Sequence, residues 1–260
     1  KKSFIDWQAD IAFDFHEFQP TRKEFSGIGN EGASASYDVL FLPSGYLNIP
    51  VGLRRASNEI FQKEAEQALE NHGYTHNFYF TADVSGEEMI LSKGAQSPHS
   101  SSTSYALSNA VSMLVEVRGI GLGRTSFARR THSSYIVARS FLESAMTHEE
   151  ELRRIIAEAR DETTSARNDI VVLSEPSFYQ TGVVFIDLET GDLVTPNLTV
   201  RDAENMSPRL VRSRPEGYIL ESQCNREIEI LSLLGLQVEP LRKKKKINVE
   251  SYVISEYKEA

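Results

Sequence analysis

Two short stretches of this sequence place ionisable side chains at the end or in the middle of apolar, strand-like runs. In IAFDFHEF, Asp14 and His16 stand two residues apart, and in SMLVEVRG, Glu116 interrupts an apolar run. An imidazole can bind a metal ion or move a proton. A carboxylate flanked by leucine and valine loses water, which raises its pKa towards the range of a general base. The sequence therefore offers His16 as a candidate metal ligand and Glu116 as a candidate base.

Strand periodicity determines which neighbours share a face with these two residues. Alternate residues of a strand face the same side, so Asp14 lies on the side of His16, where it could orient the imidazole, and Glu116 shares a face with Arg118. Two ordinary roles compete with chemistry: His16 as a hydrogen-bonded structural residue, and Glu116 as the ion-pair partner of Arg118. A catalytic zinc site needs three protein ligands and an open position, so one histidine does not suffice.

The elements that must position these residues follow from apolar spacing. The alternation in residues 10–15 and the run AVSMLVEVRG predict strands. Residues 57–72 predict a helix, with Gly73 as its stop. Apolar positions spaced three and four residues apart predict one long helix over residues 126–160.

The polar segment DETTSARN, residues 161–168, predicts a domain boundary. After it come short strand-like runs and a segment that predicts a hairpin with its turn at Thr190-Gly191. The chain is therefore expected to be α/β, with a mixed sheet flanked by helices over residues 1–165 and a smaller α+β domain over residues 169–260.

Composition excludes several classes of protein. The 260 residues are 40% hydrophobic and 25% charged, which is ordinary for a globular chain, and the net charge of −9 argues against a nucleic-acid binder. The basic run RKKKK, residues 242–246, is interpreted as a solvated turn. One cysteine, Cys224, excludes an internal disulfide framework and a cysteine-rich zinc cluster. No apolar run approaches the ~20 residues of a membrane span. The missing initiating methionine suggests a piece of a longer chain.

Three stretches carry a resemblance to a known family: ADIAFDFHEF, YALSNAVSMLVEVRGIGLGR and FARRTHSSYIVARSFLESA. In this order they resemble the zinc metallocarboxypeptidases of the carboxypeptidase A type, in particular divergent bacterial branches. The resemblance covers roughly residues 7–145, about half of the chain. The later residues resemble the C-terminal extension found in those branches.

The resemblance implies roles for both candidate residues. His16 matches the family's third zinc ligand, and Glu116 matches its general base. Zinc would polarise the scissile carbonyl and lower the pKa of its water, and Glu116 would pass the water proton to the leaving amine. Peptide or protein C-termini would be the substrates, and a periplasmic or secreted location is favoured.

One departure limits this interpretation. The family's first two zinc ligands come from an upstream H-x-x-E motif, and no histidine precedes His16. The H-x-x-E at His148–Glu151 follows His16 and lies in the charged stretch HEEELRR, so we reject it as the zinc motif. The family's substrate-binding arginines are also upstream. The chain by itself is therefore expected to be inactive and to retain no stoichiometric zinc.

Three other functions stay open at this point. A degenerate, non-catalytic peptide-binding module would keep the fold without the chemistry, and a zinc amidase or deacylase of the desuccinylase type would keep the chemistry on another substrate. Nucleotide binding is suggested by GIGLG between a strand and a helix, but the dinucleotide glycine spacing and a Walker lysine are absent. The glycines favour a tight turn instead.

Overall fold

The structure is a computed structural model, which describes residues 2–85, 88–165, 168–243, 246–251 and 253. Contacts between Cα atoms divide the chain into two compact units. One is Ala9–Glu216, and the other combines Lys1–Gln8 with Gly217–Ala260.

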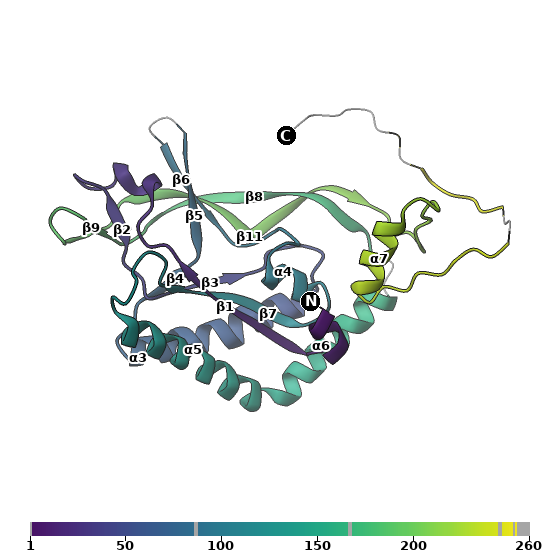
Figure 1. The fold of residues 1–260 in the computed structure, drawn as a ribbon, viewed down its shortest axis with the longest axis horizontal. Coiled ribbons are helices and arrows are strands. Elements are labelled where there is room, and N and C mark those ends of the chain that lie inside the picture. The colour runs from purple at the N-terminus through teal and green to yellow at the C-terminus, as the bar shows by residue number, and fades with distance from the viewer. Residues whose placement is uncertain (1, 86–87, 166–167, 244–245, 252, 254–260) are drawn as a thin grey trace. The chain divides into compact units, whose positions relative to one another are not determined.

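A mixed four-stranded sheet with the order β1-β7-β3-β4 lies at the centre of the Ala9–Glu216 unit (Figure 1). Its strands are β1 (Ile11–Phe18), β7 (Val111–Arg118), β3 (Val39–Pro43) and β4 (His76–Phe78). β1 runs parallel to β7, β7 antiparallel to β3, and β3 parallel to β4. The predicted mixed sheet flanked by helices is therefore confirmed.

Helices cover one face of this sheet. They are α2 (Val51–Arg55), the π-helical turn η2 (Ala56–Gln62), α3 (Lys63–Asn71), α5 (Phe127–Thr147) and α6 (Glu149–Ser165). The short helix α4 (Ser101–Ala106) precedes β7 and contacts β7, β1 and β3. Alternate residues of β7, from Val111 to Val117, pack against these helices in the largest apolar cluster. β7 is buried on both faces, which explains why it reads as a nearly continuous apolar run.

Two helix boundaries differ from the prediction. The segment α2-η2-α3 begins at Val51 rather than at residue 57, because Leu53 already packs in the apolar cluster. It ends as expected before Gly73, which has a φ of 71°. The predicted long helix is interrupted at His148, whose φ of −106° separates α5 from α6.

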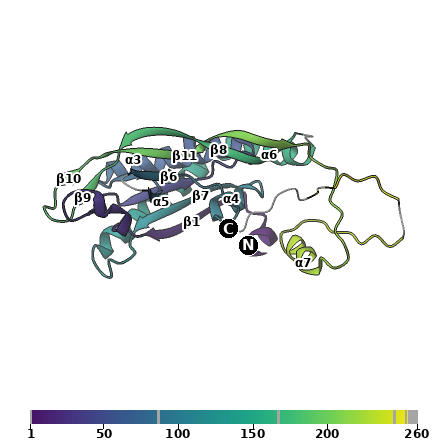
Figure 2. The ribbon, with the colours of Figure 1, turned by 90° about the horizontal axis from the view of Figure 1, so that it is seen from above.

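β-structure covers the other face of the central sheet. One sheet has the order β5-β6-β11-β8, with β5 (Phe80–Ser85), β6 (Glu88–Lys93), β11 (Asn197–Arg212) and β8 (Ile170–Gly182). The other has the order β10-β9-β2, with β10 (Leu193–Val194), β9 (Phe185–Asp187) and β2 (Ala33–Ala35), and the 3-10 helix η1 (Lys23–Gly27) contacts β2 and β5. The long strands β8 and β11 run side by side (Figure 1 and Figure 2). β9 and β10 form the hairpin predicted around Thr190-Gly191.

The strands of residues 170–212 do not form a body of their own. β11 pairs with β6, and β9 pairs with β2, so this segment completes sheets that residues 33–93 begin. We expected the second domain to start at residue 169, whereas the first compact unit continues to Glu216. Of the polar residues 161–168, residues 161–165 form the end of α6, and residues 166–167 lie outside the described residues.

The second unit contains α1 (Lys2–Trp7) and α7 (Asn225–Leu233). None of the side chains of α7 is buried. Among the described residues of both units, no helix is long and apolar enough to cross a membrane.

Candidate active site

The register between β1 and β7 brings the two candidate residues together. His16 is the Cα partner of Glu116 in this parallel pair, two positions after Asp14 pairs with Leu114 (Figure 1 shows the two strands side by side). The Nε2 atom of His16 lies 3.0 Å from Oδ2 of Asp14. The predicted juxtaposition of these three side chains on one face of the sheet is therefore present.

Glu116 lies at the centre of this arrangement and is almost fully removed from water. Its relative exposure is 8%, and its Oε2 atom finds no hydrogen-bond partner among the described residues. Burial raises the pKa of the Glu116 carboxyl above its ordinary value, against the opposing effect of His16 and Arg22 and with a small contribution from Asp14. A carboxylate that is desolvated and unpaired is a better proton acceptor than one tied up in hydrogen bonds.

Arg118 does not hold Glu116 in an ion pair, which was the main structural alternative. Its guanidinium donates hydrogen bonds to the carbonyl oxygen of Ala35 and to Oγ of Ser34, at 3.2 Å in the second case. Both acceptors belong to β2, so Arg118 ties the end of β7 to that strand. No ion pair among the described residues includes Glu116, and the carboxylate stays available.

Arg22 is a neighbour of the site that strand periodicity did not identify. Its Nε donates to the carbonyl oxygen of Gln19 at 3.1 Å, and its Cζ lies 6.0 Å from the centre of the Tyr79 ring. Its positive charge lowers the pKa of Glu116. The loop after β1 carries it there, and no spacing in the sequence announces such an approach.

The described residues do not by themselves form a three-ligand zinc site. No group of three histidine, cysteine, aspartate or glutamate side chains within the described part of the chain is placed to hold a metal ion. His16 supplies one imidazole, and the nitrogen that approaches Asp14 is its Nε2. At the rejected H-x-x-E, His148 instead contacts Glu64 at 2.7 Å and Glu151 at 3.5 Å.

The glycines of GIGLG serve the turn between β7 and α5. Gly121 and Gly123 have φ values of 83° and 55°, which favour glycine. Gly119 faces the carboxylate of Glu17, and a Cβ atom there would lie within 2.2 Å of it. Glu17 in turn contacts Arg130 of α5, so this turn joins the two elements closely.

Comparisons with known proteins extend the similarity beyond the stretches that suggested it. The chain is 27% identical to carboxypeptidase 2 of Trichophyton rubrum over 242 residues, which is 93% of this chain and 44% of that protein. It is 27% identical to the probable carboxypeptidase 2 of Trichophyton verrucosum and 26% identical to that of Arthroderma benhamiae, covering 46% and 45% of those proteins. No family model and no solved structure matches.

These comparisons give the chain a relationship along most of its length. It spans about half the length of the curated relatives it matches. The relatives are fungal, and the closer resemblance to bacterial branches stays a prediction. The chain is thus similar to proteins named carboxypeptidase 2, and its central sheet places His16 beside Glu116.

Proposed function

We propose that this chain carries part of the active site of a zinc-dependent, metallocarboxypeptidase-like hydrolase that removes C-terminal residues from peptides. The observation that carries the proposal is the pairing of His16 with the desolvated, unpaired Glu116 on one face of the central sheet. The similarity to proteins named carboxypeptidase 2 supports the peptide as substrate class.

In this proposal Glu116 is the general base. It accepts a proton from the attacking water and passes it to the nitrogen of the leaving amino acid. Its raised pKa fits such an exchange, because the group must both take up and release a proton. His16 is one metal ligand, and Asp14 orients its ring. The described residues supply no three-ligand group, so in this proposal a longer protein that contains the chain provides the other ligands.

The test uses a longer protein that contains this chain and releases C-terminal residues from a peptide. Glu116→Gln should lower the rate of release by at least about 10²–10⁴-fold while zinc content stays at the wild-type level, because the base is lost and the ligands are kept. His16→Ala should lose both release and zinc. Metal analysis and a peptide-release assay measure the two effects separately.

Glu17→Gln is the matched control. It removes the carboxylate that directly follows His16 in the sequence, but this carboxylate forms an ion pair with Arg130 of α5. It should keep most of the activity. Near-normal turnover of Glu116→Gln would show that Glu116 is not the base. A loss of zinc in Glu116→Gln would instead give this residue a structural role at the metal.

A further inference from the structure

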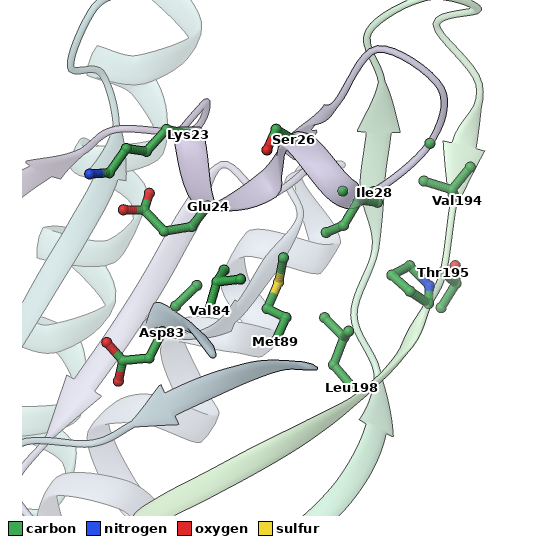
Figure 3. Close-up of a pocket in the computed structure, with 14 residues that line it drawn as sticks. Lys23, Glu24, Ser26, Ile28, Asp83, Val84, Met89, Val194, Thr195 and Leu198 are labelled. Atoms are coloured by element: carbon green, nitrogen blue, oxygen red, sulfur yellow. The ribbon is translucent and has the colours of Figure 1, made fainter. Parts of the chain in front are cut away.

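A large cleft lies between η1, the strands β5 and β6, and the segment that joins β10 to β11 (Figure 3). Its volume is ≈ 1100 Å³. Pockets for small ligands usually hold about 300–1,000 Å³. The cleft therefore has room for several residues of an extended chain.

The floor of the cleft is a row of apolar side chains across three strands. Val84 of β5 is the cross-strand partner of Met89 of β6. Leu198 of β11 precedes Thr199, whose partner in β6 is Ile90, so the row continues onto a third strand. Figure 3 shows Val84, Met89 and Leu198 facing Ile28 across the cleft. Val84 is 53% exposed, so this end of the row is open to solvent, whereas Met89 and Leu198 pack against the apolar cluster that contains Ile28.

The outer edge of β5 supplies backbone groups at the same place. β5 ends the sheet β5-β6-β11-β8, and within the described ranges no strand pairs with its outer side. Alternate residues of an edge strand direct their N–H and C=O groups outward, where an extended peptide can pair with them. Three residues of this strand, Ala82, Asp83 and Val84, line the cleft.

Two segments lead from the candidate base to this cleft. Arg22, whose charge acts on Glu116, is followed directly by Lys23 at one end of the cleft. Tyr79, which lies under the Arg22 guanidinium, directly precedes β5. Figure 3 shows Lys23 with Glu24 and Asp83 at that end, and the apolar row beyond them.

We propose that the cleft binds an extended stretch of peptide, which pairs with the outer edge of β5 and lays an apolar side chain against Val84, at the open end of the row Val84–Met89–Leu198. As a subsite for substrate, it rests on the proposed function, because the bound peptide would be a more distant part of the same chain that reaches Glu116. The apolar floor of the cleft suits an apolar side chain of the peptide, and the unpaired edge of β5 suits the hydrogen-bonding groups of the peptide backbone.

The test measures binding and not turnover, with the 260-residue chain and a labelled octapeptide that is acetylated and amidated and has leucine at alternate positions. Fluorescence anisotropy should show saturable binding, and a peptide with serine in place of leucine should bind at least about tenfold more weakly. Val84→Asp should weaken binding of the leucine peptide by a similar factor. Val172→Asp is the matched control, because Val172 is 50% exposed on β8 and does not line the cleft.

Hydrogen exchange on the unaltered chain gives a second readout. Binding of the leucine peptide should slow exchange of alternate amides of β5, as pairing with its outer edge requires. The proposal is overturned if the leucine peptide does not bind, if both aspartate variants bind equally well, or if β5 gains no protection. The proposal is also overturned if the chain forms a dimer that Val84→Asp dissociates and the leucine peptide does not compete with dimer formation. The exposed apolar row would then be an interface between two copies of the chain. Because no cleavage is needed, failure of the Glu116 experiment would leave this result standing.

Discussion

Asp38 and Glu116 are carboxylates with the same small exposure, 8% each, and opposite surroundings. Asp38 accepts hydrogen bonds from Nε and Nη2 of Arg129 at 2.6 and 2.7 Å and from the backbone and hydroxyl of Thr75 at 2.9 and 3.0 Å. Burial raises the pKa of Asp38, but the Arg129 and Thr75 hydrogen bonds outweigh it and leave the pKa lowered. Glu116 has an unpaired oxygen and a raised pKa. Burial alone therefore does not determine the direction in which the pKa of a carboxyl shifts; its hydrogen bonds decide it.

The Asp38 cluster predicts a pH-dependent stability. A carboxyl whose pKa is lowered by folding stabilises the fold above its unfolded pKa of about 3.9, and this contribution is lost as the pH falls through the lower folded value. Asp38→Asn should lower the free energy of unfolding at pH 7 by about 1–3 kcal/mol. We expect less than for a fully buried pair, because the Arg129 side chain is 47% exposed. Urea unfolding at pH 7 and below pH 4 should show the variant's deficit shrinking in acid, and Asp192→Asn, at an exposed position, should show little deficit at either pH.

The opposite prediction applies to the same change at Glu116. Glu116→Gln replaces a desolvated, unpaired carboxylate by a neutral amide, so the free energy of unfolding at pH 7 should stay within about 0.5 kcal/mol of the original or rise by about 1 kcal/mol. Such a gain in stability with a loss of activity is typical of residues that serve function. Urea unfolding of the two amide variants side by side tests this. A deficit at Glu116 as large as that at Asp38 would identify Glu116 as a structural carboxylate.

Among the elements, β11 is the strand on which the second layer depends. Its register with β8 shifts between Asp202 and Met206, so the strand bulges there. Lys93 of β6 lies at this bulge, with its Nζ 3.5 Å from Asp202 and 3.2 Å from Glu204. Gly45, in the loop after β3, also meets the bulge, since a Cβ atom there would lie 1.8 Å from the carbonyl oxygen of Ala203. The bulge thus brings β11 into close backbone contact with the chain that leaves the central sheet.

This contact predicts that Gly45 tolerates no side chain. Gly45→Ala should lower the free energy of unfolding by about 1–3 kcal/mol, because the atom it meets is backbone and cannot rotate away. Gly27→Ala is the matched control, since a Cβ atom at Gly27 has no neighbour within 4 Å. The urea midpoint of both variants checks the prediction. An equal effect at the two positions would show that the bulge can move away from Gly45.

At the scale of the whole molecule, the apolar clusters indicate which parts of the chain can be removed without loss of the fold. The second apolar cluster combines Phe25, Phe80 and Leu91 with Phe185 and Val200, so both sides of the segment 161–168 contribute to it. α7, beyond residue 217, buries no side chain. The cooperative structure should therefore depend on the strands of residues 170–212 and not on the C-terminal segment.

Two truncated chains test this division. Residues 9–216 should unfold cooperatively, with a thermal midpoint within about 5 °C of the full chain, because both apolar clusters are intact. Residues 1–165 should lack a cooperative transition, because β2 and β6 lose their partners β9 and β11. Circular dichroism during heating measures both. A cooperative transition in the chain that ends at residue 165 would restore the domain boundary first expected from the polar segment.

Much of the central layer could be predicted from the sequence because periodicity is a local property. Alternation of side chains along a strand placed Asp14 with His16, and Ser112 and Leu114 with Glu116, before any partner strand was known. The helix predicted over residues 57–72 contains α3, and the one predicted over residues 126–160 covers α5 and most of α6. Thr190 and Gly191 predicted the turn of the β9–β10 hairpin. By itself, then, the sequence determined which side chains share a face of a strand and where the elements with clear periodicity lie.

Only the tertiary structure decided which residues of different elements come into contact. The β1–β7 register puts His16 beside Glu116, a loop carries Arg22 towards the same carboxylate, and Arg118 turns to β2 instead. The same holds for β9 and β11, which join sheets begun much earlier in the chain. The physical reason is that strand pairing and ion pairing join residues far apart in sequence, and their energies depend on the partner's position, which local spacing does not specify.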